Sequence, residues 1–173
     1  MIEHEVKVLD IDAQLVMKQL EKLWAEHYHT VFIKDWYYDT KDDSLRKQNQ
    51  RLRIRCEDNT IVITKKIKYE HDYTKSMKED DITVKSVKYA KKLLEEELWL
   101  VCKKYKEKKR VTYKRKNTLF DFDYYEDMPP VLEIEGESPE HVMDIVRRLG
   151  LHFHPQVKRW SRRLFKHYGK KHL

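Results

Sequence analysis

The chain has 173 residues, a formal net charge of +7 and 39% charged residues, but only three glycines. A chain of this length can build one domain with its own core, and its 40% hydrophobic content excludes a disordered polyampholyte. Glycine-rich phosphate loops of the P-loop and dinucleotide-binding kinds need several closely spaced glycines, so the sequence excludes both. Any phosphate bound by this protein would have to be held by side chains.

The positive charge is concentrated in two segments. Residues 103–116 contain nine basic residues and one acidic residue, and residues 158–173 contain seven basic residues and no acidic one. Such segments are typical of a nucleic-acid patch, an anion-binding strand or a solvated tail. Charge alone does not choose between these three interpretations.

The two cysteines indicate a protein of a reducing compartment. Cys56 and Cys102 have no metal-ligand spacing around them, which indicates neither a zinc site nor a disulfide framework. No apolar run approaches the length of a membrane span, and the first residues do not resemble a signal peptide. We therefore expect a single cytoplasmic domain over residues 1–173, without a membrane partner.

The first half of the chain alternates between strand and helix patterns. Apolar and charged residues alternate over residues 2–8, which predicts a half-buried strand. A helical spacing of apolar residues follows over 15–24, with Asp10 or Asp12 as its N-cap. Further strand patterns occupy residues 31–38, 51–56, 60–66 and 79–85.

The second half begins with a helical pattern over residues 90–101. Strand patterns follow over residues 108–114, 119–125 and 132–135. Ser138 and Pro139 predict the start of a third helix that ends at Gly150, and the basic segment 157–168 predicts a last helix. About eight strands, joined mostly by short turns, favour an antiparallel sheet in an α+β protein.

The polar face of these strands carries full charges of both signs. In one arrangement, an open sheet packs helices on its apolar face and exposes the charges to solvent. In the other, eight strands close into a barrel with helices outside and charges inside. A barrel of eight strands is wide enough to surround one small ligand. Buried charges require pairing with each other, with a metal or with a charged ligand. The pattern alone leaves both arrangements open.

The first strand contains an E-x-E-x-K motif. Its alternation places Glu3, Glu5 and Lys7 on one face, about 7 Å apart along the strand. Adjacent carboxylates suit a hard divalent cation such as Mg²⁺ or Mn²⁺, which prefers oxygen ligands.

Together with six later blocks in the same order, this motif resembles the CYTH family, also called triphosphate tunnel metalloenzymes. That family includes inorganic triphosphatases, thiamine triphosphatases and class IV adenylyl cyclases. The later blocks are Tyr37-Tyr38-Asp39-Thr40, Leu52-Arg53-Ile54-Arg55, Thr64-Lys65-Lys66, Lys108-Lys109-Arg110, Asp123 and Glu133-Ile134-Glu135.

The resemblance implies an eight-stranded antiparallel β-barrel, or tunnel, with a charged interior and helices packed outside. It further implies that acidic residues hold Mg²⁺ or Mn²⁺ on one wall and basic residues bind a triphosphate on the other. The implied metal residues are Glu3, Glu5, Asp123, Glu133 and Glu135. The implied substrate-binding residues are Lys7, Arg53, Arg55, Lys66, Lys108 and Arg110. Among them, Glu5, Lys7 and Glu133 are expected to be catalytic.

Strand alternation extends the two walls. It adds the acids Glu79 and Asp81 and the bases Arg51 and Lys114, which brings seven inward acids to face eight inward bases. This near balance suits an anion chelated with a cation. Two points stay open: Glu79 and Asp81 either join the metal site or lie in a solvated turn, and a register shift of one residue would replace Lys66 by Lys65.

The sequence thus predicts a metal-dependent hydrolase of inorganic tripolyphosphate or an organic triphosphate. The alternatives are a class IV adenylyl cyclase, which makes cyclic AMP from ATP, and a non-catalytic binder of polyphosphate or RNA 5′-triphosphate. We expect a small triphosphate, rather than nucleic acid, as the partner. The oligomeric state, monomer or homodimer, stays open, and the basic C-terminal segment is either part of a binding surface or an amphipathic lid.

Overall fold

A computed structural model describes residues 2–69, 75–157 and 162–170, and it has an α+β fold with one antiparallel sheet. The strands are β1 (Ile2–Val8), β2 (Glu26–Asp39), β3 (Gln50–Glu57), β4 (Thr60–Tyr69), β5 (Lys75–Val84), β6 (Val101–Arg115), β7 (Thr118–Tyr124), β8 (Val131–Gly136) and β9 (Gln156–Val157). The α-helices in the described residues are α1 (Ala13–Lys22), α2 (Ser44–Lys47), α3 (Val87–Lys92), α4 (Pro139–Arg148) and α5 (Arg162–His167).

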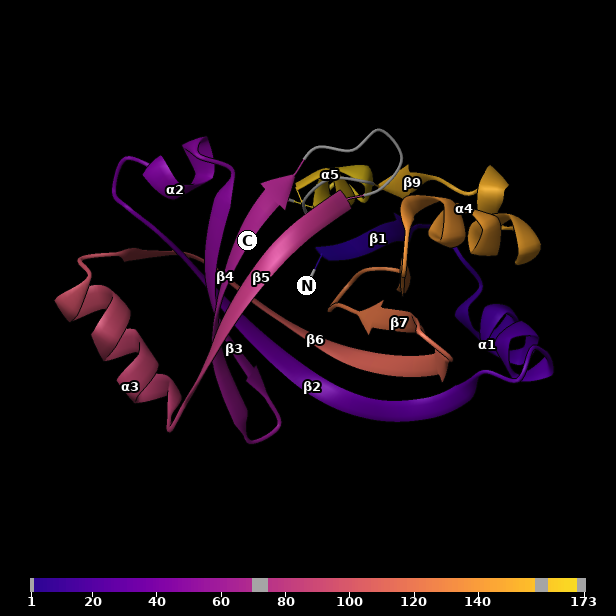
Figure 1. Ribbon diagram of the computed structural model, residues 1–173, viewed down its shortest axis with the longest axis horizontal. Coiled ribbons are helices and arrows are strands. Elements are labelled where there is room, and N and C mark those ends of the chain that lie inside the picture. Colours follow the sequence, from indigo (N-terminus) through magenta and orange to yellow (C-terminus); the bar gives the residue numbers. More distant parts are fainter. Residues whose placement is uncertain (1, 70–74, 158–161, 171–173) are drawn as a thin grey trace.

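The strand order in the sheet is β5-β4-β3-β2-β6-β7-β8-β1-β9, and all pairings between neighbouring strands in the described residues are antiparallel. Strand β5, which begins this order, also pairs with β1 near its other end. The register of this additional pairing runs from Ile2 opposite Lys78 to Glu5 opposite Lys75. Figure 1 shows the sheet curving so that β5 passes close to β1.

The helices cover the outer side of the sheet. Figure 1 shows α3 at one end of the molecule and α1 with α4 at the other. Three apolar clusters lie beneath these helices: Val6 and Val8 pack in the cluster under α1 and α4, Ala90 and Leu94 in the cluster under α3, and Leu164 in the cluster under α5. Because side chains alternate along a strand, burying the apolar residues outward turns the charged residues of the same strands inward.

Two helix starts confirm the sequence prediction. The Asp12 side chain accepts a hydrogen bond from the Leu15 backbone N–H at the start of α1, so Asp12 rather than Asp10 is the N-cap. Ser138 accepts from the His141 N–H at the start of α4, with Pro139 at its first position.

Two helix predictions were wrong in their bounds. The predicted helix over 90–101 starts at Val87 and ends as a short π-helical turn at Glu97. Trp99 has a positive φ of 56°, which turns the chain, and Val101 already belongs to β6. The last helix begins at Arg162 rather than 157, since Val157 pairs with Lys7 as part of β9. None of the helices in the described residues is long and apolar enough to cross a membrane.

Candidate functional site

The inner faces of the strands surround a cavity of about 270 Å³. Its lining combines eight cationic and seven acidic side chains with three tyrosines. The cationic residues are Lys7, Arg51, Arg53, Arg55, Lys66, Lys106, Lys108 and Arg110. The acidic residues are Glu5, Asp35, Glu57, Glu79, Asp121, Glu133 and Glu135. All six predicted substrate-binding residues therefore meet in one space, together with three of the predicted metal residues.

One corner of the cavity holds acidic residues of β1 and β8. The register places Glu5 opposite Glu135 and Lys7 opposite Glu133 on these neighbouring strands. The Lys7 ammonium forms an ion pair with Glu133 and lies 3.9 Å from Glu5. Arg110 Nη2 lies 3.6 Å from Glu133 on the other side. The carboxylates of this corner are therefore balanced by two cations, Lys7 on β1 itself and Arg110 on β6. Glu3 lies on β1, but its side chain is outside the described part of the structure.

Asp123 lies behind the cavity wall rather than on its surface. It is 1% exposed, and its carboxylate accepts hydrogen bonds from Lys108 at 2.5 Å and from Arg110 at 2.6 and 2.9 Å. Burial alone would raise the pKa of Asp123, but the charges of Arg110 and Lys108 hold it far below its usual value. Asp123 thus orients the two cations of the K-x-R motif.

The strand β3 contributes three arginines to the cavity, and their surroundings differ. Arg55 donates to both oxygens of Asp35, from Nε at 2.8 Å and from Nη2 at 2.9 Å. Arg53 Nε is buried and has no hydrogen-bond partner among the described residues, and the nearest oxygen of Asp35 lies 3.8 Å away. Arg51 stacks over the Tyr37 ring at 5.0 Å. Of the two arginines of the R-x-R motif, Arg53 therefore keeps unused hydrogen-bonding capacity toward a ligand.

The strands β4 and β5 show which of the residues that the sequence left open line the cavity. Lys66 lines the cavity and forms an ion pair with Glu79, while Lys65 is exposed, so the register favours Lys66. Glu79 faces the cavity, whereas Asp81 is exposed and does not line it. The prediction that Lys114 faces inward was wrong: it lies exposed beyond the end of the cavity, over the Tyr28 ring.

Several cavity residues were missed by the sequence reasoning. Asp35 and Tyr37 share one parity in the predicted strand 31–38, and Lys106 shares parity with Lys108 and Arg110, so extending the alternation would have found all three. The remaining ones are Tyr28, His29, Glu57, Thr112, Leu119, Asp121, Tyr125 and Val157. Thr112 donates to buried Asp121 at 2.6 Å and lies 3.1 Å from His29 Nε2, an interaction that no sequence motif signals.

Burial lowers the pKa values of two cavity lysines, Lys108 and Lys106. Desolvation, followed by the charge of Arg110, lowers the pKa of Lys108 to about 7, against the opposing effect of Asp123. Desolvation, followed by the charges of Lys104, Arg51 and Lys108, lowers the pKa of Lys106 to about 5. An anion placed in the cavity would oppose both shifts.

The acidic corner suits a divalent cation in its chemistry. Glu5, Glu133 and Glu135 supply only carboxylate oxygens, the ligands that Mg²⁺ and Mn²⁺ prefer. Among the described residues, however, no three acidic, histidine or cysteine side chains are already gathered to hold an ion. The Lys7 ammonium occupies the space beside Glu133, so metal binding would require Lys7 to move toward another anion.

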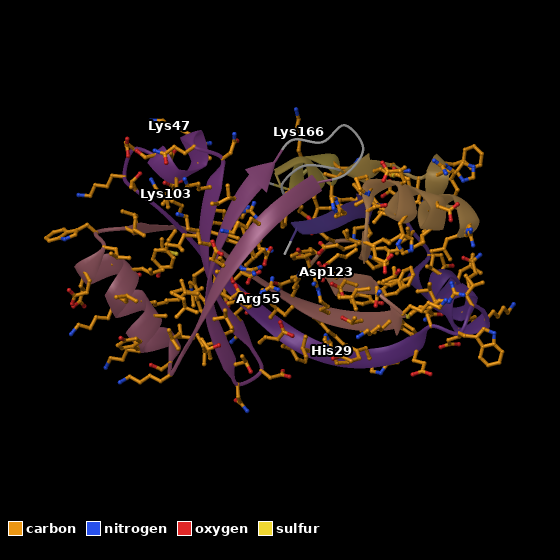
Figure 2. The ribbon with its side chains drawn as sticks, in the orientation of Figure 1. His29, Lys47, Arg55, Lys103, Asp123 and Lys166 are labelled. Carbon is orange, nitrogen blue, oxygen red and sulfur yellow. The ribbon has the colours of Figure 1, made fainter. Side chains whose placement is uncertain are left out.

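Figure 2 shows how these residues lie relative to the surface. Arg55 and Asp123 lie toward the middle of the molecule, among the inner side chains, whereas Lys47 and Lys166 lie at its outer edge. Neither Lys47 nor Lys166 lines the cavity, so these two basic side chains are separate from it.

Comparisons with known proteins agree with this architecture. The family model for the CYTH domain matches residues 1–157. A protein of Methanocaldococcus jannaschii named "Putative adenylate cyclase MJ0240" is 29% identical over 155 residues, which cover 87% of this chain and 74% of the relative.

Two solved structures illustrate the shared fold. A "putative adenylate cyclase" from Vibrio parahaemolyticus has a TM-score of 0.79 at 15% identity and covers 96% of this chain and 98% of its own. A Hippeastrum protein described as "Putative adenylyl cyclase HpAC1", with a dominant triphosphatase activity, has a TM-score of 0.65 at 17% identity. That match covers 98% of this chain and 96% of the other.

Proposed function

This chain belongs to the CYTH family, and we propose that it is a divalent-metal-dependent hydrolase that binds a triphosphate inside the cavity. The observation that carries the proposal is the meeting of eight cationic and seven acidic side chains in one cavity. Such a set of charges is costly to bury unless a charged ligand completes it. We also propose that the β1–β5 pairing closes the sheet into the tunnel that holds this ligand.

The basic wall would bind the phosphate chain. Arginine forks bind phosphate oxygens bidentately, and lysines add point charges. The buried Nε of Arg53 has no hydrogen-bond partner among the described residues, and Arg55 and Arg110 are held in place by Asp35 and Asp123. These ion pairs orient the guanidinium groups, which lowers the cost of arranging the donors at the moment of reaction. Lys66 and Lys108 extend the same wall.

The acidic corner would hold the cofactor, Mg²⁺ or Mn²⁺, through Glu5, Glu133 and Glu135. A divalent cation there supplies charge neutralisation for the phosphates and a lower pKa for coordinated water. Lys7 pairs with Glu133 and can turn to a phosphate oxygen once the carboxylate has another partner. Glu5, Lys7 and Glu133 are therefore the residues that we assign to catalysis.

Phosphoryl transfer needs positioning and charge stabilisation more than covalent chemistry. Attack by water on the terminal phosphorus makes the protein a triphosphatase, the activity described for the Hippeastrum relative of the same fold. Attack by a ribose 3′-hydroxyl on the α-phosphorus would instead make cyclic AMP. The name of the Methanocaldococcus relative favours this second candidate.

A comparison of three substrates tests the proposal. Purified protein is incubated with tripolyphosphate, ATP or thiamine triphosphate, with Mg²⁺ or Mn²⁺ and with an EDTA blank. We expect metal-dependent release of orthophosphate. Cyclic AMP and pyrophosphate from ATP would establish the second candidate, and tight tripolyphosphate binding without any product would identify a non-catalytic binder.

A further inference from the structure

One lysine of the cavity has no acidic partner among the residues that the structure describes. Lys106 on β6 is 8% exposed and lines the cavity, yet no described carboxylate lies within ion-pair distance of its ammonium. The residue opposite it in the register is Asp35, and that carboxylate is already engaged by Arg55. Lys106 therefore differs from Lys7, Lys66 and Lys108, which all pair with acids.

The groups that surround Lys106 are aromatic or cationic. Its Nζ lies 4.0 Å from the Phe165 ring centre, 5.9 Å from that of Tyr37 and 6.0 Å from that of Tyr125. The titratable groups that act on it most strongly are the cations Lys104, Arg51 and Lys108. Ring faces attract a cation, but they replace only part of the hydration that burial removes.

We propose that Lys106 is an additional phosphate-binding residue, whose amine takes up a proton when an anionic phosphate chain enters the cavity. This inference rests on the proposed triphosphate binding and adds a residue outside the K-x-R motif. The position of Lys106 supports this role, because the side chain is buried beside three cations, lines the cavity and has no carboxylate partner among the described residues.

The lowered pKa of Lys106, about 5 in the ligand-free protein, agrees with this arrangement. At pH 7 the amine is then mostly neutral, which relieves the repulsion from Arg51, Lys104 and Lys108. A bound polyanion shifts the protonation equilibrium of Lys106 back toward the ammonium form, because its negative charge stabilises that form. Binding should therefore be coupled to proton uptake.

Titration calorimetry tests the coupling directly. Sodium tripolyphosphate is titrated into the protein at pH 7 with EDTA present, in two buffers of different ionisation enthalpy, which yields the number of protons exchanged. The wild type should take up about one proton more than Lys106→Met. Lys106→Met should also bind roughly ten-fold more weakly. Lys109→Met, a substitution of an exposed lysine on the same strand, should match the wild type in proton uptake and in affinity for tripolyphosphate.

The outcomes separate this inference from the proposed function. If the wild type binds tripolyphosphate but Lys106→Met exchanges the same number of protons, Lys106 is a structural residue and the inference is overturned. If the wild type does not bind tripolyphosphate, the proposed function fails and the inference falls with it. Lys106→Arg provides a second test that does not depend on the methionine variant: it should bind tripolyphosphate without the additional proton uptake, since arginine stays charged.

Discussion

Arg55 on β3 and Asp35 on β2 form a bidentate ion pair inside the cavity, with N–O distances of 2.8 and 2.9 Å. Burial alone would raise the pKa of Asp35, but the hydrogen bonds and charge of Arg55 hold it far below its usual value. Arg53, two residues along the same strand, has a buried Nε without such a partner. The two arginines of one motif therefore have different tasks: Arg55 is fixed by the protein, and Arg53 is available to a ligand.

This difference predicts unequal effects of the two substitutions on the free energy of unfolding. Arg55→Met should lower the free energy of unfolding by about 2–3 kcal/mol, because it leaves the buried Asp35 with only a distant partner. Arg53→Met should change it by less than about 1 kcal/mol, since it removes a cation that burial and Arg55 already disfavour. Urea unfolding measures the free energy of unfolding of both variants. Equal losses of stability in the two variants would contradict the assignment of separate tasks to Arg53 and Arg55.

Asp123 is predicted to be the most costly acid to neutralise. Asp123→Asn leaves Lys108 and Arg110 buried without their shared carboxylate, so we expect a loss of about 3 kcal/mol in unfolding free energy. Thermal unfolding in EDTA checks this without any contribution from a metal. The control is Asp80→Asn, which changes an exposed residue of β5 and should cost less than about 0.5 kcal/mol. A stability unchanged by Asp123→Asn would show that this pairing contributes little.

Lys106 should make the free protein less stable at neutral pH. Its pKa is about 5 when folded and about 10.4 when unfolded, so the unfolded chain binds more protons between these values. The contribution of Lys106 to stability therefore falls as the pH decreases from about 10 toward 5. Lys106→Met should raise the unfolding free energy at pH 7 by at least about 1 kcal/mol, or the Tm by roughly 2–4 °C. A variant less stable than the wild type at pH 7 would contradict the lowered pKa.

Metal binding should depend on the acidic corner. Glu5→Gln and Glu135→Gln should each weaken Mn²⁺ binding roughly ten-fold, because each removes one charged oxygen ligand. Calorimetric titration of Mn²⁺ into the protein measures this. Glu126→Gln, at an exposed position, is the matched control. Unchanged Mn²⁺ affinity in both corner variants would place the metal elsewhere.

Strand alternation predicted most of the charged side chains of the cavity, because parity is a local property of each strand. Glu5, Lys7, Arg53 and Arg55 reach the cavity for the same reason that Val6 and Ile54 reach the outer core. The partners of these charges could not be predicted in this way. That Arg55 pairs with Asp35 follows from the register between β2 and β3, which the sequence of one strand does not contain.

The limits of periodicity also explain the wrong helix bounds. Apolar spacing continued through Leu98 and Val101, but Trp99 adopts a positive φ and the Leu100 N–H bonds back to the Leu94 carbonyl. The chain then enters β6, where Val101 lies opposite Asp39. Tertiary pairing decided where this helix ends, and a helical pattern alone cannot show it.

The most direct test of the account is the rate of orthophosphate release from tripolyphosphate with Mg²⁺, measured for the wild type, Glu133→Gln and Glu126→Gln. We expect metal-dependent release by the wild type and by Glu126→Gln, and a rate about 10²-fold or more lower for Glu133→Gln. Full activity of Glu133→Gln, or release by the wild type that persists in EDTA, would contradict metal-dependent hydrolysis at the acidic corner of the cavity.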